Sequence, residues 1–194
     1  MINLKSAVLS VAVTTLMCSA VAQAAWTVAP ESRVMFVSLK NDVIAENNAF
    51  EAISGSITED GHVAISIDLS SVETGVGIRN ERLQKMLFNV ANFPVASIDA
   101  VLSESQITAL RAGGAPTERV SLNISLHGKT VSKTANVSVS SSGGEVRVTT
   151  TQPIVITAQE FGLESGVAAL QQIAGLNAIS RSIPVTVDLR LSAD

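Results

Sequence analysis

The sequence has very few of the residue types that build catalytic and metal sites. It contains one cysteine, two histidines and no tyrosine. Cys18 lies in an N-terminal segment that we expect to be removed, which leaves no thiol for disulfides, catalysis or metal binding. His62 and His127 stand far apart, and two histidines alone do not make a zinc site. No nucleophile elbow, His-Glu-x-x-His pair or phosphate loop is present. We therefore predict no catalytic residue, no metal, no cofactor and no enzymatic activity.

The chain is also poor in basic residues. It carries 13 lysines and arginines against 17 aspartates and glutamates, a formal net charge of −4. No cluster of lysines and arginines appears anywhere along it. Proteins that bind nucleic acid or an anionic lipid surface depend on such clusters. We therefore predict neither of these partners.

The N-terminus has the pattern of a secretory signal peptide. Lys5 precedes an apolar run over residues 7–17, and small residues follow at 20–25. The run is shorter than the roughly 20 residues that a bilayer-spanning helix needs, so a membrane anchor is the weaker alternative. Acylation of Cys18 would need a small residue shortly before it, which the sequence lacks. We predict a cleaved signal peptide at 1–24 and one exported domain at 25–194, not membrane-spanning after cleavage.

Eight segments of the exported part have the alternating pattern of β-strands. Residues that favour turns, such as glycine, proline, aspartate and serine, lie between them at 59–61, 112–116, 127–129 and 140–144. The connections are short, so neighbouring strands should be antiparallel, and a closed sheet would leave no free edges. We predict an all-β fold, an eight-stranded antiparallel barrel, with strands at 26–39, 53–57, 63–69, 95–101, 120–126, 131–139, 146–156 and 183–191.

Two segments instead have apolar residues at helical spacing. They span residues 78–89 and 164–174. We predict one or two short helices, each covering a barrel end. The surrounding segment 162–182 reads as a surface elaboration, with a lid over the barrel as the alternative.

Several phrases stand in a recognisable order along the chain. They are Trp26 ahead of 32–36, Phe50 ahead of Gly55, and the segments 71–75, 79–83, 88–94, 126–130 and 160–163. Together they resemble the YceI-like family. The resemblance implies a lipocalin-like barrel in the bacterial periplasm that holds a polyisoprenoid or quinone tail in an elongated apolar cavity. It implies a binding or carrier protein for such a lipid.

The resemblance also suggests which residues contact a ligand. The phenylalanines occupy the family's recurring aromatic positions, and nearby aliphatic residues could complete an apolar lining. The predicted pocket is Phe36, Phe50, Leu83, Leu87, Phe88, Phe93, Ile98 and Phe161. Ordinary core packing is the alternative for each. Arg79 and Arg82 could contact a polar or phosphorylated head group, with a salt bridge to Glu73 or Glu81 as the alternative.

The barrel interior decides between the functions that remain open. An eight-stranded barrel has room either for its own side chains or for one slim ligand. Many strand positions are Val, Ile or Ala, which favours a narrow void and a lipid carrier. A filled barrel would instead indicate a stress-related interaction protein, and a hidden enzyme would need a polar group with a shifted pKa inside. Pairing of two barrels around a long tail, as a homodimer, stays an open alternative.

Overall fold

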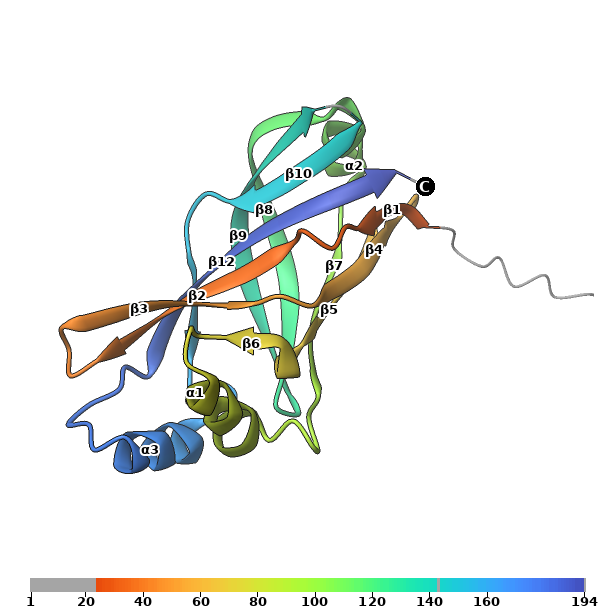
Figure 1. Ribbon diagram of the computed structural model, residues 1–194. Coiled ribbons are helices and arrows are strands. Elements are labelled where there is room, and N and C mark those ends of the chain that lie inside the picture. Colours follow the sequence, from red (N-terminus) through yellow and green to blue (C-terminus); the bar gives the residue numbers. More distant parts are fainter. Residues whose placement is uncertain (1–23, 143, 194) are drawn as a thin grey trace, which may run out of the picture.

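A computed structural model describes residues 24–142 and 144–193. The predicted signal peptide therefore lies outside the described residues, apart from Ala24, which begins the first strand. Figure 1 shows a barrel with short helices at its two ends. Every strand pairing is antiparallel, as the short connections predict.

Eight strands close the barrel. The last of them pairs back with the first, Trp26 lying opposite Ala193 and Val28 opposite Leu191. This closure confirms the predicted eight-stranded antiparallel barrel. In ring order the strands are β1 (Ala24–Val28), β4 (Ile53–Thr58), β5 (His62–Asp68), β7 (Val95–Val101), β8 (Gly114–Leu126), β9 (Lys129–Ser142), β10 (Glu145–Thr150) and β12 (Ser182–Ala193).

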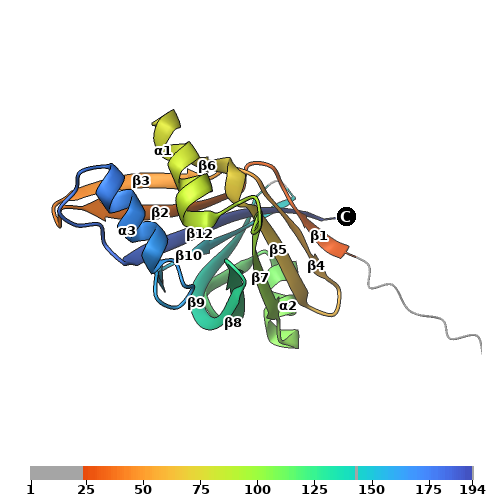
Figure 2. The ribbon, with the colours of Figure 1, turned by 90° about the horizontal axis from the view of Figure 1, so that it is seen from below.

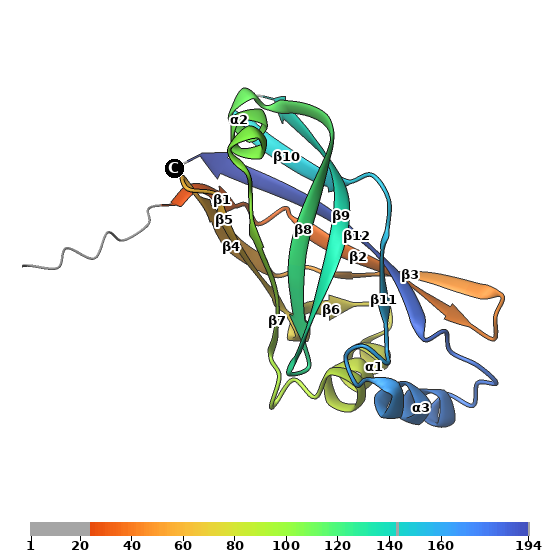
Figure 3. The same ribbon diagram turned by 180° about the vertical axis from the view of Figure 1, so that it is seen from behind.

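Four further strands extend the ring. β2 (Arg33–Lys40) continues the line of β1 along β12, and β3 (Ile44–Phe50) precedes β4 and pairs with β2. β11 (Ile154–Thr157) follows β10 along β12, and the two-residue β6 (Val72–Glu73) pairs with β3. The β2–β3 hairpin projects beyond the barrel wall in Figures 1 and 3.

Two of the predicted strands were wrong in detail. The segments 26–39 and 146–156 are each interrupted, near Pro30 and at Pro153, because proline offers no N–H to a neighbouring strand. Strand β3 was not predicted, since Glu46, Asn47 and Asn48 hide its alternation.

Two of the three helices cover the same end of the barrel. α1 (Gly77–Arg82) runs directly into a π-helix, η2 (Leu83–Phe88), and α3 (Glu164–Ile173) packs beside η2. Figure 2 views this end from below. Gly166 allows the contact, because a Cβ there would lie only 2.7 Å from the Met86 carbonyl oxygen. Both predicted helices are present.

The third helix, α2 (Glu104–Ala112), was not predicted and lies at the opposite end (Figure 3). Only Ile107 and Leu110 are buried in it, so it shows no long apolar stripe. Its start does carry a capping box between Ser103 and Gln106, a signal that the sequence contains. A 3₁₀ turn, η1 (Leu69–Ser71), follows β5.

Candidate functional site

The barrel encloses an apolar cavity of about 420 Å³ at the end covered by α1 and α3. Its walls come from β2, β3, β5, β7, β8, β11 and β12, and from α1, η2 and α3. Val76, Ile78 and Ile173 line it and are still 41–55% exposed, so they mark its open mouth between α1 and α3. The volume lies within the range of known small-ligand pockets.

Six of the eight predicted pocket residues line this cavity. They are Phe36, Phe50, Leu83, Leu87, Phe88 and Ile98. The rings of Phe36 and Phe50 lie 5.4 Å apart, and those of Phe50 and Phe88 lie 5.6 Å apart. These spacings are typical of packed aromatic pairs. The three rings form a continuous aromatic wall from the sheet to η2.

The other two predicted residues lie elsewhere. The ring of Phe93 packs 4.4 Å from the ring of His127 and contacts the position of Gly128 in the β8–β9 turn. Phe161 is completely buried in a separate cluster with Leu163 and Val167. An aromatic residue at a barrel end can pack inward or against a turn, and sequence alone does not separate these roles.

The segment 162–182 forms part of the cavity wall. Leu163, Val167 and Leu170 face the cavity from α3 and its start, and Leu176 and Ile179 follow from the loop after it. The prediction of a mere surface elaboration was therefore wrong. The segment was misread because its apolar positions look the same whether they pack on the outside of a barrel or cover its opening.

The β2–β3 hairpin becomes more polar toward the mouth. Val34 pairs with Phe50 in the interior, and Phe36 pairs with Asn48 nearer the mouth. Asn48 is only 5% exposed, and its Nδ2 donates to the hydroxyl of Ser38 and to the Glu46 carbonyl, each at 3.1 Å. The carbonyl acceptor fixes the orientation of the amide. Its Oδ1 is left buried without a hydrogen bond at the cavity wall.

Four cationic side chains line the cavity, and none of the described carboxylates does. Arg79 and Lys40 both pair with Glu46, which bridges them from the side. The expected partners Glu73 and Glu81 were therefore wrong. Glu73 accepts hydrogen bonds from the Gly75 N–H and the Asn80 amide, which lower its pKa, and Glu81 pairs with Lys85.

Arg82 and Arg181 are the remaining two cations. Across 24–142 and 144–193, neither makes an ion pair or a side-chain hydrogen bond. Arg82 was predicted as a head-group contact, whereas Arg181 was missed, because it lies in an irregular stretch just before β12. The mouth therefore carries two cations available to a ligand.

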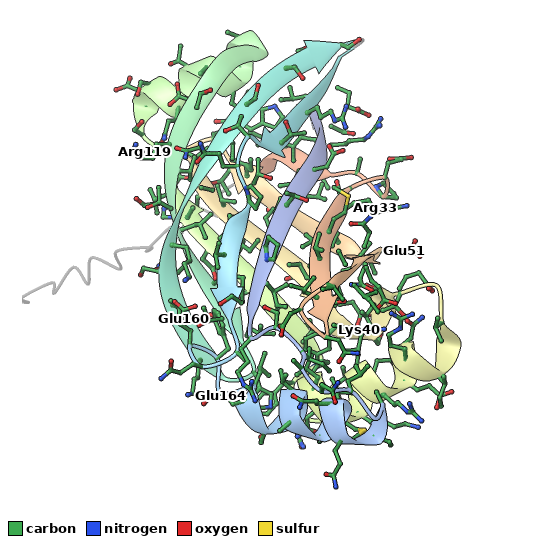
Figure 4. All side chains as sticks on the ribbon, turned by 90° about the vertical axis from the view of Figure 1, so that its left-hand side faces the viewer. Arg33, Lys40, Glu51, Arg119, Glu160 and Glu164 are labelled. Atoms are coloured by element: carbon green, nitrogen blue, oxygen red, sulfur yellow. The ribbon has the colours of Figure 1, made fainter. Side chains whose placement is uncertain are left out.

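A salt bridge joins β9 to the end of β11, where these two described parts of the barrel wall share no strand pairing. We call this place the seam. Among the described strands, β11 pairs only with β12. Lys133 Nζ lies 2.5 Å from Glu160 Oε1, and Glu160 Oε2 accepts from the N–H and hydroxyl of Thr157 at 3.0 and 2.8 Å. Figure 4 shows Glu160 toward the helix-covered end, with Arg119 toward the other. These bonds, first from Lys133 and then from Thr157, lower the pKa of Glu160.

We expect this seam to make the barrel acid-sensitive. Because the folded-state pKa of Glu160 lies below the unfolded value of 4.5, its contribution is present above that value and is lost as pH falls through the lowered pKa. Glu160→Gln should be less stable than the native chain at neutral pH and should lose less stability on acidification. Thermal unfolding between about pH 7 and 3 measures, for the variant and for the native chain, the slope of folding stability against pH. Glu59→Gln, in an exposed turn, is the control, and equal slopes for E160Q and the native chain would contradict the assignment.

The described residues hold neither a metal cluster nor a membrane helix. In this part of the chain, no three His, Cys, Asp or Glu side chains gather where they could hold a metal ion. None of its helices is long and apolar enough to cross a membrane.

Comparison with known proteins places the chain in a family. The model of the YceI-like domain matches residues 26–191. A polyisoprenoid binding domain from Saccharophagus degradans, implicated in plant cell wall breakdown, is 31% identical, with a TM-score of 0.80 over 89% of this chain and 100% of that one. A search of curated protein sequences finds no match.

Two more distant structures share the fold. BcnA of Burkholderia cenocepacia is 18% identical, with a TM-score of 0.64 over 82% of this chain and 95% of that one. The YCEI protein of Campylobacter jejuni is 10% identical, with a TM-score of 0.53 over 74% and 82%. The family match over nearly the whole described chain and the 31% identical structure agree, and we conclude that the chain belongs to the YceI-like family.

Proposed function

We propose that this protein binds an isoprenoid-type lipid in the periplasm and carries its polyprenyl or quinone tail inside the barrel. The observation that carries the proposal is the apolar cavity of about 420 Å³, which opens between α1 and α3. The polyisoprenoid binding domain from Saccharophagus degradans, with the same fold, supports it. The signal-peptide pattern at 1–24 supports export. A filled barrel, the alternative, would leave no cavity of this size.

The energetics of such binding are favourable. Each methylene moved out of water contributes about 0.8 kcal/mol, so ten buried carbons contribute roughly 8 kcal/mol. Association costs about 4 kcal/mol or more. Partial burial of a prenyl tail is therefore enough for useful binding, and no chemical step is needed.

A direct binding titration tests the proposal. Purified mature protein is titrated with farnesol, geranylgeraniol and a short-tailed ubiquinone, with displacement of a fluorescent fatty acid as the readout. Saturable binding at one ligand per barrel supports the proposal. No binding of any prenyl compound would favour the alternative of a filled-barrel interaction protein.

The two unpaired arginines favour an anionic head group, such as a prenyl phosphate, at the mouth. Arg82→Gln should weaken binding of farnesyl phosphate by about ten- to a hundredfold, because a charge-assisted hydrogen bond contributes roughly 1.5–3 kcal/mol. Binding of farnesol should not change, since the tail contacts stay intact. Competition titrations with both compounds measure the difference.

Lys85→Gln is the matched control for this prediction. Lys85 follows Arg82 by three positions, but it is 73% exposed, pairs with Glu81 and does not line the cavity. Lys85→Gln should leave the affinities for farnesol and for farnesyl phosphate unchanged. If R82Q weakened the binding of farnesol and of farnesyl phosphate equally, Arg82 would act only as part of the cavity wall. A neutral head group, such as a quinone, would then be favoured.

A further inference from the structure

The barrel contains a second apolar cavity beyond the first. It measures about 120 Å³ and lies toward α2, at the end of the barrel opposite the mouth. Its wall includes Ala100, Leu122, Val137 and Leu189 from four neighbouring or facing strands, and Leu110 from α2. We call the larger cavity the main chamber and this one the far chamber.

The two chambers share three lining residues, Ile98, Ile154 and Val187. These come from β7, β11 and β12, which lie around the interior of the barrel. Ile98 packs against the buried cluster that contains Ile154, so the two side chains belong to one contact group. The three side chains lie where the two chambers meet, and we call them the partition.

Ile98 is the bulky member of its strand face. Side chains alternate across a strand, so Ala96, Ile98 and Ala100 of β7 point to the same side. Ala96 lines the main chamber, Ala100 lines the far chamber, and Ile98 lines both. The alanines leave room on either side, and the isoleucine narrows the space between them.

The far chamber reaches α2 at its outer end. Leu102 and Leu110 line it there, and Gln106 of α2 is tied down by bonds to the Ser103 N–H at 2.9 Å and the Arg119 carbonyl at 2.8 Å. A water molecule occupies roughly 30 Å³ of liquid volume, and a tail carbon needs about the same space. The far chamber, at about 120 Å³, therefore has room for about one isoprene unit.

We propose that Ile98, with Ile154 and Val187, sets the length of prenyl tail that the barrel accepts. This proposal rests on the proposed function. The tail fills the main chamber and stops at the partition, so further units stay outside and add no burial. Removing the Ile98 side chain joins the chambers, and enlarging it shortens the main chamber.

A graded prenol series tests the proposal. Affinities are measured for geraniol, farnesol, geranylgeraniol, geranylfarnesol and solanesol. For the native chain we expect affinity to rise with length and then level off. In Ile98→Ala the plateau should begin about one isoprene unit later. The prenol that is one unit longer than the native limit should bind the variant at least tenfold more tightly than it binds the native chain. In Ile98→Phe the plateau should begin earlier.

Ile53→Ala is the matched control. Ile53 is 7% exposed in the same core but lines neither chamber, so its truncation should cost stability and leave the plateau in place. If I98A does not fold, I98F decides alone. An unchanged plateau in every folded Ile98 variant would overturn the proposal while leaving lipid binding intact. Absence of prenol binding by the native chain would overturn the proposed function, and this proposal with it.

Discussion

Val185→Trp is expected to weaken prenyl binding about a hundredfold while leaving the barrel folded. Val185 lies on β12 between Phe36 of β2 and Ile154 of β11, and its side chain lines the main chamber. An indole ring at this position would occupy the space of several tail carbons. Loss of about four buried carbons costs roughly 3 kcal/mol, or about a hundredfold in affinity. Titration with geranylgeraniol measures the loss, and circular dichroism verifies the fold.

The same strand pair offers a matched control. Val155 lies on β11 opposite Pro184, is 51% exposed and does not line the chamber. Val155→Trp therefore adds the same ring to the outside of the wall and should bind geranylgeraniol as the native chain does. If a folded V185W kept native affinity, the ligand would not occupy the main chamber.

Phe161→Ala is expected to cost about 3–5 kcal/mol of folding free energy, since truncation of a buried aromatic removes its contacts and leaves a cavity. Phe161 is completely buried against Leu163 and Val167, which begin the segment covering the mouth. The melting temperature should fall by on the order of 10 °C. Differential scanning calorimetry measures the change.

Phe93→Ala is the comparison for Phe161→Ala, and ligand affinity in both variants distinguishes a role in folding stability from ligand contact. Phe93 is only partly buried and packs against His127 of the β8–β9 turn, so the loss of stability in this variant should be smaller. Neither residue lines the main chamber, and both variants should keep native affinity for geranylgeraniol at temperatures where they are folded. A large loss of affinity in a folded F161A would place Phe161 in the binding site after all.

Much of the barrel follows from local pattern. Alternation marks most strands, because one face packs inward on every strand of a closed sheet. The pattern fails on a strand beside the cavity. On β3, Asn48 lines the cavity, and Glu46 pairs with Lys40 and Arg79 beside it. Polar residues therefore interrupt the apolar alternation, and the strand was not predicted.

The candidate site was harder to predict than the fold. Phe36, Phe50 and Phe88 could be proposed from the family's aromatic positions, and they do line the chamber. Phe161 has the same character in sequence but packs in a separate cluster. Arg181 belongs to no helix or strand, so only the folded chain shows that it lies at the mouth. The pairing of Arg79 with Glu46 joins α1 to β3, a contact between elements that local pattern does not specify.

Native mass spectrometry with organic extraction tests the central claim most directly. The mature protein is purified without detergent from the periplasmic fraction of its natural host, and its intact mass is compared with that of the bare polypeptide. We expect a stoichiometric extra mass that extracts as a prenyl lipid, and V185W purified in the same way should lack it. A bare polypeptide mass for the native chain, together with no uptake of added prenols or quinones, would contradict the claim that this barrel carries an isoprenoid.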